Sequence, residues 1–150
     1  MFKRGILKFV IVCSVGLSFS GCAIFVPVID SYKSIGVQRS DRERLLNKEL
    51  VAFNQARFWG PKGNTLQYVD EKAQEVMIDY LREQKEEKIV ESQVDFVTFQ
   101  EDAYEAKVSA RVKFYRVPYY VVEEREESQS WVFSLSDGWK IRSIETVHES

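Results

Sequence analysis

The chain carries few of the side chains from which catalytic and metal sites are usually built. Its one histidine, His148, stands close to the C-terminal end of the sequence, and its two cysteines are Cys13 and Cys22. A catalytic triad needs a firmly positioned histidine, and a structural zinc site needs several cysteine or histidine ligands. The patterns H-E-x-x-H and C-x-x-C and an acidic calcium loop are also missing from the sequence. We therefore expect no catalytic residues of these kinds, no metal site and no cofactor.

The composition is that of one folded domain. The chain has 150 residues, of which 45% are hydrophobic and 13% aromatic, enough to build a core and too many for a disordered protein. The net charge of -2 gives no indication of nucleic acid as a partner.

The N-terminal segment has the layout of an export signal. Lys3, Arg4 and Lys8 precede a stretch that runs from Phe9 to Ile29 without a charge. A basic start followed by an apolar run directs the rest of the chain across a membrane, because the charged end stays on the cytoplasmic side.

The tetrapeptide Phe19-Ser20-Gly21-Cys22 lies within this apolar run. It resembles the lipobox of bacterial lipoproteins, although Phe19 stands where that family usually has an aliphatic residue. The resemblance implies that residues 1–21 are a signal peptide, that Cys22 is the site of lipid attachment, and that the bilayer is a partner through the acylated cysteine. Ala23 follows the cysteine, and the sorting rule of enterobacterial lipoproteins then implies an outer-membrane protein that faces the periplasm.

An uncleaved anchor in the inner membrane is the alternative. Phe9 to Ile29 is 21 residues long, and a helix needs about 20 apolar residues to cross a bilayer. In both cases the rest of the chain lies beyond the membrane. Loss of residues 1–21 would remove three positive charges, so that the mature chain carries a net charge of -5.

Residues 22–39 are expected to form a tether, and residues 40–150 a single domain. The sequence Ser40-Asp41-Arg42-Glu43 matches a capping box, which predicts a helix that starts there and ends by Gly60-Pro61. One stripe of this helix carries four residues at helical spacing, Leu46, Leu50, Phe53 and Arg57.

A second amphipathic helix is predicted from about Asp70, its N-cap, to Gln84. The charged run Arg82 to Lys88 is interpreted as its solvated end. After that the hydrophobic period changes from 3.6 to 2, which predicts strands. The expected strands, 94–99, 104–115, 120–135 and 139–144, are separated by turn signals at Glu101-Asp102, Pro118 and Asp137-Gly138. Glu123 to Ser130 is polar on both faces and is expected to project past the core.

Helices grouped before a run of hairpin-connected strands predict an α+β fold. We expect two N-terminal helices packed on a curved four-stranded antiparallel sheet.

The pattern resembles the nuclear transport factor 2-like superfamily, a cone of curved sheet wrapped over N-terminal helices. The likeness rests on Phe53-x-x-Ala56-x-x-Trp59-Gly60, Tyr68-Val69-Asp70, Gln129-x-Trp131-x-Phe133 and Asp137-Gly138-Trp139-Lys140-Ile141. Many uncharacterised bacterial lipoproteins share this spacing. Members of the superfamily often have three helices, whereas this sequence shows two.

The resemblance admits several functions, because one fold hosts many of them. A ketosteroid-isomerase-like enzyme would need a carboxylate base, for which Asp70 and Asp95 are candidates, and an oxyanion donor such as Tyr68, Tyr104 or Tyr115. A ligand carrier would need an open, mostly apolar cavity. The preferred expectation is a non-enzymatic lipoprotein that binds an envelope protein or a small ligand through the concave face of the sheet. The residues expected at the contact are Trp59, Tyr68, Phe96, Tyr115, Trp131 and Phe133.

Overall fold

The computed structural model describes residues 35–147, except for the side chain of Lys62. The expected signal peptide, Cys22 and most of the 22–39 tether lie outside this range. The chain divides into two compact units, Met1–Ile35 and Gly36–Ser150, and only the second is described below. This unit begins earlier than the boundary expected at Ser40.

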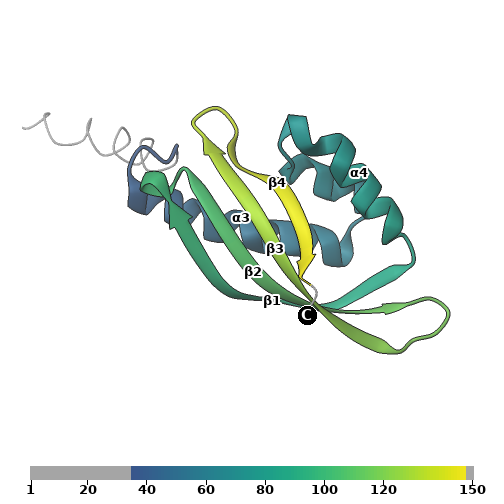
Figure 1. The fold of residues 1–150 in the computed structure, drawn as a ribbon. Helices are drawn as coiled ribbons and strands as arrows, with labels where there is room; N and C mark the ends of the chain where they lie inside the picture. The colour runs from purple at the N-terminus through teal and green to yellow at the C-terminus, as the bar shows by residue number, and fades with distance from the viewer. Residues whose placement is uncertain (1–34, 148–150) are drawn as a thin grey trace, which may run out of the picture. The chain divides into compact units, whose positions relative to one another are not determined.

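The unit has an α+β architecture in which helices precede a four-stranded antiparallel sheet (Figure 1). The strands follow one another in the order β1-β2-β3-β4, so that each pairs with its neighbour along the chain. This confirms the predicted fold class and the four-stranded antiparallel meander. The elements in chain order are α3 (Arg39–Trp59), η1 (Lys62–Tyr68), η2 (Glu71–Ala73), α4 (Gln74–Glu83), β1 (Glu87–Gln100), η3 (Glu101–Ala103), β2 (Glu105–Arg116), β3 (Val122–Ser134) and β4 (Gly138–Val147).

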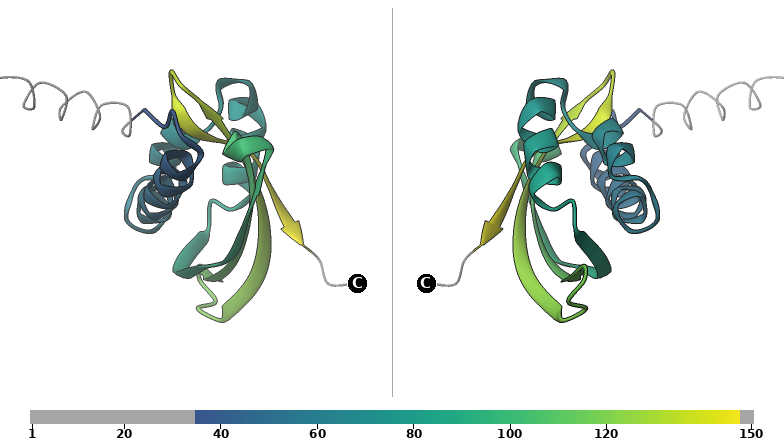
Figure 2. Two further views of the ribbon diagram at one scale, coloured as in Figure 1. Left: turned by 90° about the vertical axis from the view of Figure 1, so that its left-hand side faces the viewer. Right: turned by 90° about the vertical axis from the view of Figure 1, so that its right-hand side faces the viewer.

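The long helix α3 lies along one face of the sheet (Figure 2). Its apolar stripe meets large side chains of β3 and β4, and the ring of Phe53 stands edge-on to Trp131 at a centroid distance of 5.7 Å. Both residues are 1% exposed. The core contains twelve residues, Leu46, Leu50, Phe53, Val69, Ala73, Met77, Ala106, Val108, Trp131, Phe133, Trp139 and Ile141.

The start of α3 differs from the predicted capping box. The N-cap is Gln38, which makes no side-chain cap, and Glu43 accepts a hydrogen bond from Arg39 instead of capping the helix. The N-terminal end of α3 is held by Arg42, which is 4% exposed and donates hydrogen bonds to the carbonyl groups of Gly36 and Asp102. One buried guanidinium therefore joins the first residues of the domain to η3.

The boundary between α4 and β1 also corrects the prediction. Asp70 is the expected cap, and its carboxylate accepts from the backbone N–H of Lys72, but η2 lies between it and α4. The charged run does not continue as a solvated helix end, because α4 stops at Glu83 and β1 begins at Glu87. Glu87 is buried, at 7% exposed, by arginines that the next strands supply.

The three hairpins of the sheet turn at the predicted positions, and the structure corrects the extent of the projecting segment. Pairing of β2 ends at Arg116, just before Pro118. The hairpin that joins β2 to β3 projects past the helices (Figure 1). The sequence predicts that all of Glu123 to Ser130 projects past the core. Only part of it does, because Glu127 and Gln129 are buried, at 0% and 1% exposed. The β3–β4 turn is a three-residue loop closed by Gly138, whose φ is 70°.

Gly36 is the glycine whose replacement we expect to cost most. Its φ is 73°, and a Cβ built there would lie 2.6 Å from Cζ of Phe133. Gly36→Ala should lower the free energy of unfolding by about 2 kcal/mol, because the backbone is left-handed and the core has no room.

Urea unfolding of the purified protein measures this effect. Gly63→Ala is the matched control, since a Cβ there meets nothing within 4 Å. Equal stability of the two variants would contradict the packing of Gly36 against Phe133.

Candidate functional site

Four of the six expected contact residues lie on opposite faces of the sheet. Trp131 and Phe133 face the helices and are 1% and 5% exposed, so they belong to the core. Phe96 pairs in register with Ser109 on the outer face and is largely exposed. Tyr115 is on that same outer face, where its ring lies 5.4 Å from that of Tyr120. These four side chains therefore do not form one contact surface.

The other two expected contact residues come close to each other at the C-terminal end of α3. Trp59 is the most exposed large hydrophobic side chain among the described residues, at 84%. Tyr68 is half-buried, with its ring edge-on to Phe53 at 5.9 Å. Both border a shallow surface hollow that also includes Ala52 and Gln55.

The carboxylate and tyrosine pairs considered for an isomerase are not assembled. Asp70 is engaged as the cap of η2. Asp95 pairs with Arg111 at 2.6 Å on the outer face, and the hydrogen bond from that guanidinium is the main reason that the pKa of Asp95 is lowered. Tyr104 lies beneath the guanidinium of Arg42, 4.2 Å from its ring centroid. In the part of the chain that the structure describes, the hydrogen bonds of these two carboxylates go to Lys72 and Arg111 and not to Tyr68, Tyr104 or Tyr115.

A buried carboxylate that the sequence did not single out is the centre of a polar network instead. Glu127 lies on β3 with its side chain inside the domain. Arg57 of α3 binds it through two hydrogen bonds of 2.8 Å, one to each oxygen. Tyr80 of α4 donates a third bond of 2.9 Å, Arg125 a fourth of 3.0 Å and Gln129 a fifth of 3.3 Å. Both oxygens are thus fully used.

The network fixes the charge state of this carboxylate. Burial alone would raise the pKa of Glu127, but the charges and hydrogen bonds of Arg57 and Arg125 outweigh it and lower the pKa to about 2. The pKa of Tyr80 is raised by burial and by the neighbouring negative charge of Glu127. Glu127 is therefore ionised at neutral pH and saturated with donors, which suits a structural role better than that of a general base.

The same network continues toward the β2–β3 hairpin. Arg125 also binds the carboxylate of Glu87 and the side-chain oxygen of Gln84, at the junction between α4 and β1. Arg116 at the end of β2 donates to Glu87 at 2.8 Å and to Glu123 at 2.8 Å. The base of the hairpin is thereby tied to the end of α4 by charge-assisted hydrogen bonds.

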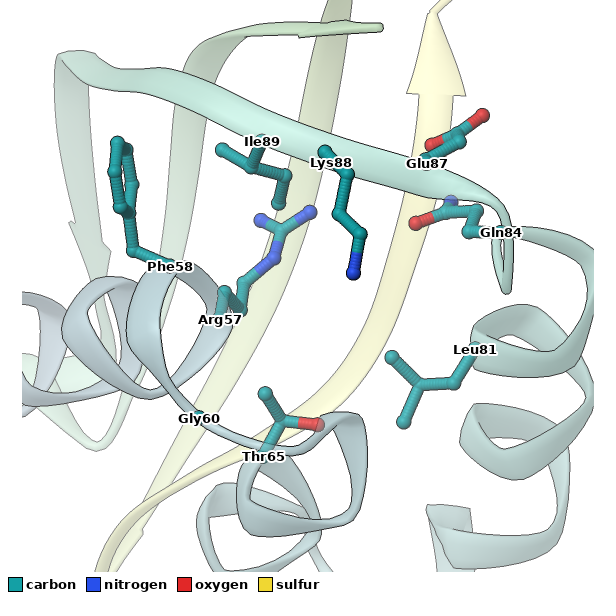
Figure 3. A pocket seen from close by; sticks show the side chains of 9 residues that line it. All are labelled: Arg57, Phe58, Gly60, Thr65, Leu81, Gln84, Glu87, Lys88 and Ile89. Carbon is teal, nitrogen blue, oxygen red and sulfur yellow. The ribbon is translucent and has the colours of Figure 1, made fainter. Parts of the chain in front are cut away.

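A small pocket opens beside this network (Figure 3). Its volume is about 100 Å³, and it lies between the C-terminal end of α3, η1, α4 and the start of β1. Drug-sized ligands need roughly 300–1,000 Å³. Figure 3 shows the side chains of Lys88 and Leu81 pointing into this space. Its lining residues are Arg57, Phe58, Gly60, Thr65, Leu81, Gln84, Glu87, Lys88 and Ile89.

A wider groove of about 660 Å³ lies on the surface between the end of α4, the end of β4 and the hairpin. The inward-facing ring of Phe114 lies beneath the guanidinium groups of Arg116 and Arg125, at 4.9 and 4.6 Å. We call this groove the acidic groove, because it is lined by more carboxylates than guanidinium groups. Its lining residues are Glu83, Gln84, Glu87, Phe114, Arg116, Glu123, Glu124, Arg125, Glu126, Thr146 and Val147.

The hairpin end beside the groove is apolar and exposed. The segment Val117–Val122, which we call the tip, contains four consecutive residues that are more than half exposed. They are Tyr119, Tyr120, Val121 and Val122. Single exposed apolar residues are ordinary on protein surfaces, but a continuous run of them marks a contact surface more often.

Residues 35–147 contain no group of three or more histidine, cysteine or acidic side chains able to hold a metal ion. Within the same range, no helix has the length and apolar character needed to cross a membrane.

No family model matches the chain, and no curated protein matches it. The fold is similar to that of the intermembrane space region of the chloroplast protein ARC6, with a TM-score of 0.46 at 17% identity over 71% of this chain and 94% of that one. It is also similar to RPA3114, a SEC-C motif containing protein from Rhodopseudomonas palustris, with a TM-score of 0.49 at 13% identity over 69% of this chain and 77% of that one.

Removal of the charge on Glu127 should destabilise the domain strongly. Glu127→Gln keeps the shape of the side chain but leaves Arg57 buried without a counter-ion, so we expect a loss of about 3 kcal/mol in the free energy of unfolding. Urea titration at pH 7 measures it. Glu91→Gln removes an exposed pair with Lys113 and should cost at most about 1 kcal/mol. Similar losses in the two variants would contradict the structural role of Glu127.

The low pKa of Glu127 also predicts an acid-sensitive fold. Its pKa is about 2 in the folded protein and 4.5 ordinarily, so its contribution is complete above pH 4.5 and is lost as the pH falls toward 2. This group alone should lower the free energy of unfolding by about 2 kcal/mol between pH 7 and pH 3. Glu127→Gln should lack this part of the pH dependence, and an unchanged dependence would show that other groups cause it.

Proposed function

We propose that the chain is an envelope lipoprotein with a non-enzymatic domain that binds a partner protein. In this proposal residues 1–21 are removed, lipid on Cys22 holds the protein at the outer membrane, and the domain faces the periplasm. Its type is that of the nuclear transport factor 2-like cone, with two helices N-terminal to a curved sheet. An uncleaved anchor in the inner membrane is the alternative for the same location of the domain.

The contrast between a filled interior and an exposed tip is the observation that carries the binding role. Trp131, Trp139 and Phe53 occupy the space between helices and sheet and are each 1% exposed. The pocket left at the edge of this space is about 100 Å³. By comparison, Tyr119 and Tyr120 are 79% and 68% exposed. These values support recognition at the surface over the carriage of a ligand inside the domain.

The isomerase alternative receives less support from the arrangement of its candidate residues. Asp70 caps a helix and Asp95 pairs with Arg111, so each carboxylate already has a partner. Glu127 is the carboxylate that does face a tyrosine, at 2.9 Å from Tyr80, but five hydrogen bonds hold it. A general base needs a pKa near the working pH, and this one is about 2.

The position of the tip suits a protein held by its N-terminus. The chain enters the domain at Gly36 and continues into α3, whereas the β2–β3 hairpin projects at the opposite end of the domain (Figure 1). The point at which the chain enters the domain is therefore at the other end of the domain from the tip.

Mass spectrometry of the full-length protein from a bacterial membrane tests the anchor. The expected N-terminus is Cys22 with acyl chains on the cysteine, and Cys22→Ala should leave the signal peptide attached and the protein without lipid. An intact Met1 or an unmodified Cys22 in the unaltered protein would contradict the lipoprotein assignment.

Photo-crosslinking in native membranes tests the binding role. We expect p-benzoylphenylalanine at position 119 or 120 to give a discrete adduct with another protein. The same amino acid at position 96, on the outer face, is the matched exposed control and should give little. Adducts of equal yield at all three positions would indicate random collision and contradict recognition by the tip.

A further inference from the structure

Two surfaces of different character meet at the β2–β3 hairpin. The tip is apolar and aromatic, and the acidic groove begins where the tip ends. Arg116 and Glu123 directly flank the tip in the sequence, and both line the groove. A ligand that covers one surface is therefore within reach of the other.

The groove has a surplus of negative charge. Five carboxylates and two guanidinium groups line it. The guanidinium groups are already engaged, because Arg116 binds Glu87 and Glu123 while Arg125 binds Glu87 and Glu127.

Three of the groove's carboxylates form no salt bridge with any residue that the structure describes. Glu83, Glu124 and Glu126 make no salt bridge with any residue in the range 35–147. The cations nearest to Glu124 on the outer face, Arg111 and Lys113, are each paired already. Glu124 and Glu126 stand opposite Lys113 and Arg111 in register across β2 and β3. Because those two cations already bind Glu91 and Asp95, carboxylates still outnumber cations here, and a surplus of negative charge remains for a ligand.

The surface is also held in shape before any ligand arrives. The ring of Tyr120 packs against Tyr115 at 5.4 Å, and the bonds of Arg116 and Arg125 tie the hairpin base to the rest of the domain. A preorganised surface loses less conformational entropy on binding.

We propose that the tip and the acidic groove together bind a cationic, extended segment of a partner protein. Lysine or arginine side chains of that segment occupy the groove, and an apolar side chain packs on Tyr119 and Tyr120. This inference rests on the proposed partner-binding function and adds the chemistry of the partner. An anionic lipid surface is a poor occupant, because the groove's carboxylates would repel it, and a second copy of this acidic chain would bring like charge.

The first test adds charge reversal to crosslinking of the full-length chain in native membranes. With p-benzoylphenylalanine at position 120, the double variant Glu124→Lys/Glu126→Lys should reduce the protein adduct about tenfold, because attraction becomes repulsion. The control Glu71→Lys/Glu75→Lys makes the same charge change at two exposed positions outside the groove and should leave the yield unchanged.

The second test uses defined peptides and the purified full-length protein in neutral detergent micelles. The probe is a fluorescent peptide in which lysine alternates with valine, and its match has glutamine in place of lysine. The lysine peptide should bind, more weakly at high salt, and the glutamine peptide should not bind. The groove variant, Glu124→Lys/Glu126→Lys, should not bind the lysine peptide. Equal binding of both peptides, or equal binding by the groove variant, would overturn the proposal.

The outcomes separate this inference from the proposed function. A protein adduct that survives charge reversal would overturn the cationic partner while leaving partner binding intact. An adduct with lipid or with a second copy of the chain would overturn it as well. The absence of protein adducts at positions 119 and 120 would overturn both proposals.

Discussion

The ion pair between Arg57 and Glu127 is the interaction on which the arrangement of this domain depends. Arg57 ends the apolar stripe of α3, and Glu127 lies at the inner face of β3. A charge buried this deeply is tolerable only when it is paired and its remaining hydrogen-bonding capacity is used. Tyr80, Arg125 and Gln129 supply the remaining partners. One carboxylate therefore joins α3, α4 and the sheet.

This buried pair separates two parts of the domain with different properties. On one side of it, α3 and the sheet enclose an apolar core around Trp131 and Trp139. On the other side, β2 and β3 extend beyond the helices, and arginine–carboxylate pairs support them in place of apolar packing. Ion pairs of this kind allow a hairpin to project into solvent in a defined direction. An apolar hairpin that no other layer covers would have no such support. The tip is thus a consequence of how its base is stabilised.

The sequence predicted the fold class, the strand order and most turns because these follow from local patterns. Period-2 alternation located β2, and Pro118 marked the end of its pairing. The start of β1 was missed because charged residues near Glu87 resemble a solvated helix end until the arginines of other strands bury them. The boundary of α3 was misplaced because a capping box is a local motif, whereas Arg42 ties that end to η3, far along the chain.

The buried network was only partly predictable. Arg57 shares the apolar stripe of Phe53, and Glu127 keeps the period of Gln129 and Trp131, so both positions could have been assigned to the interior. No pattern in a single sequence predicts which buried acidic residue pairs with which buried basic residue. The expected contact residues also mixed two faces of the sheet. For Phe96 the reason is a bulge in β1 between Val94 and Phe96, which changes which side chains of that strand face inward.

Hydrogen–deuterium exchange of the full-length protein tests the central claim, that this domain acts through its projecting hairpin. Exchange would be compared between the protein in native membranes and the purified protein in detergent micelles. We expect extra protection in membranes at residues 116–126 and at 83–87, which border the groove, with little change along α3 or the outer face of the sheet. Protection confined to α3 or to the outer face, or identical exchange in both preparations, would contradict it.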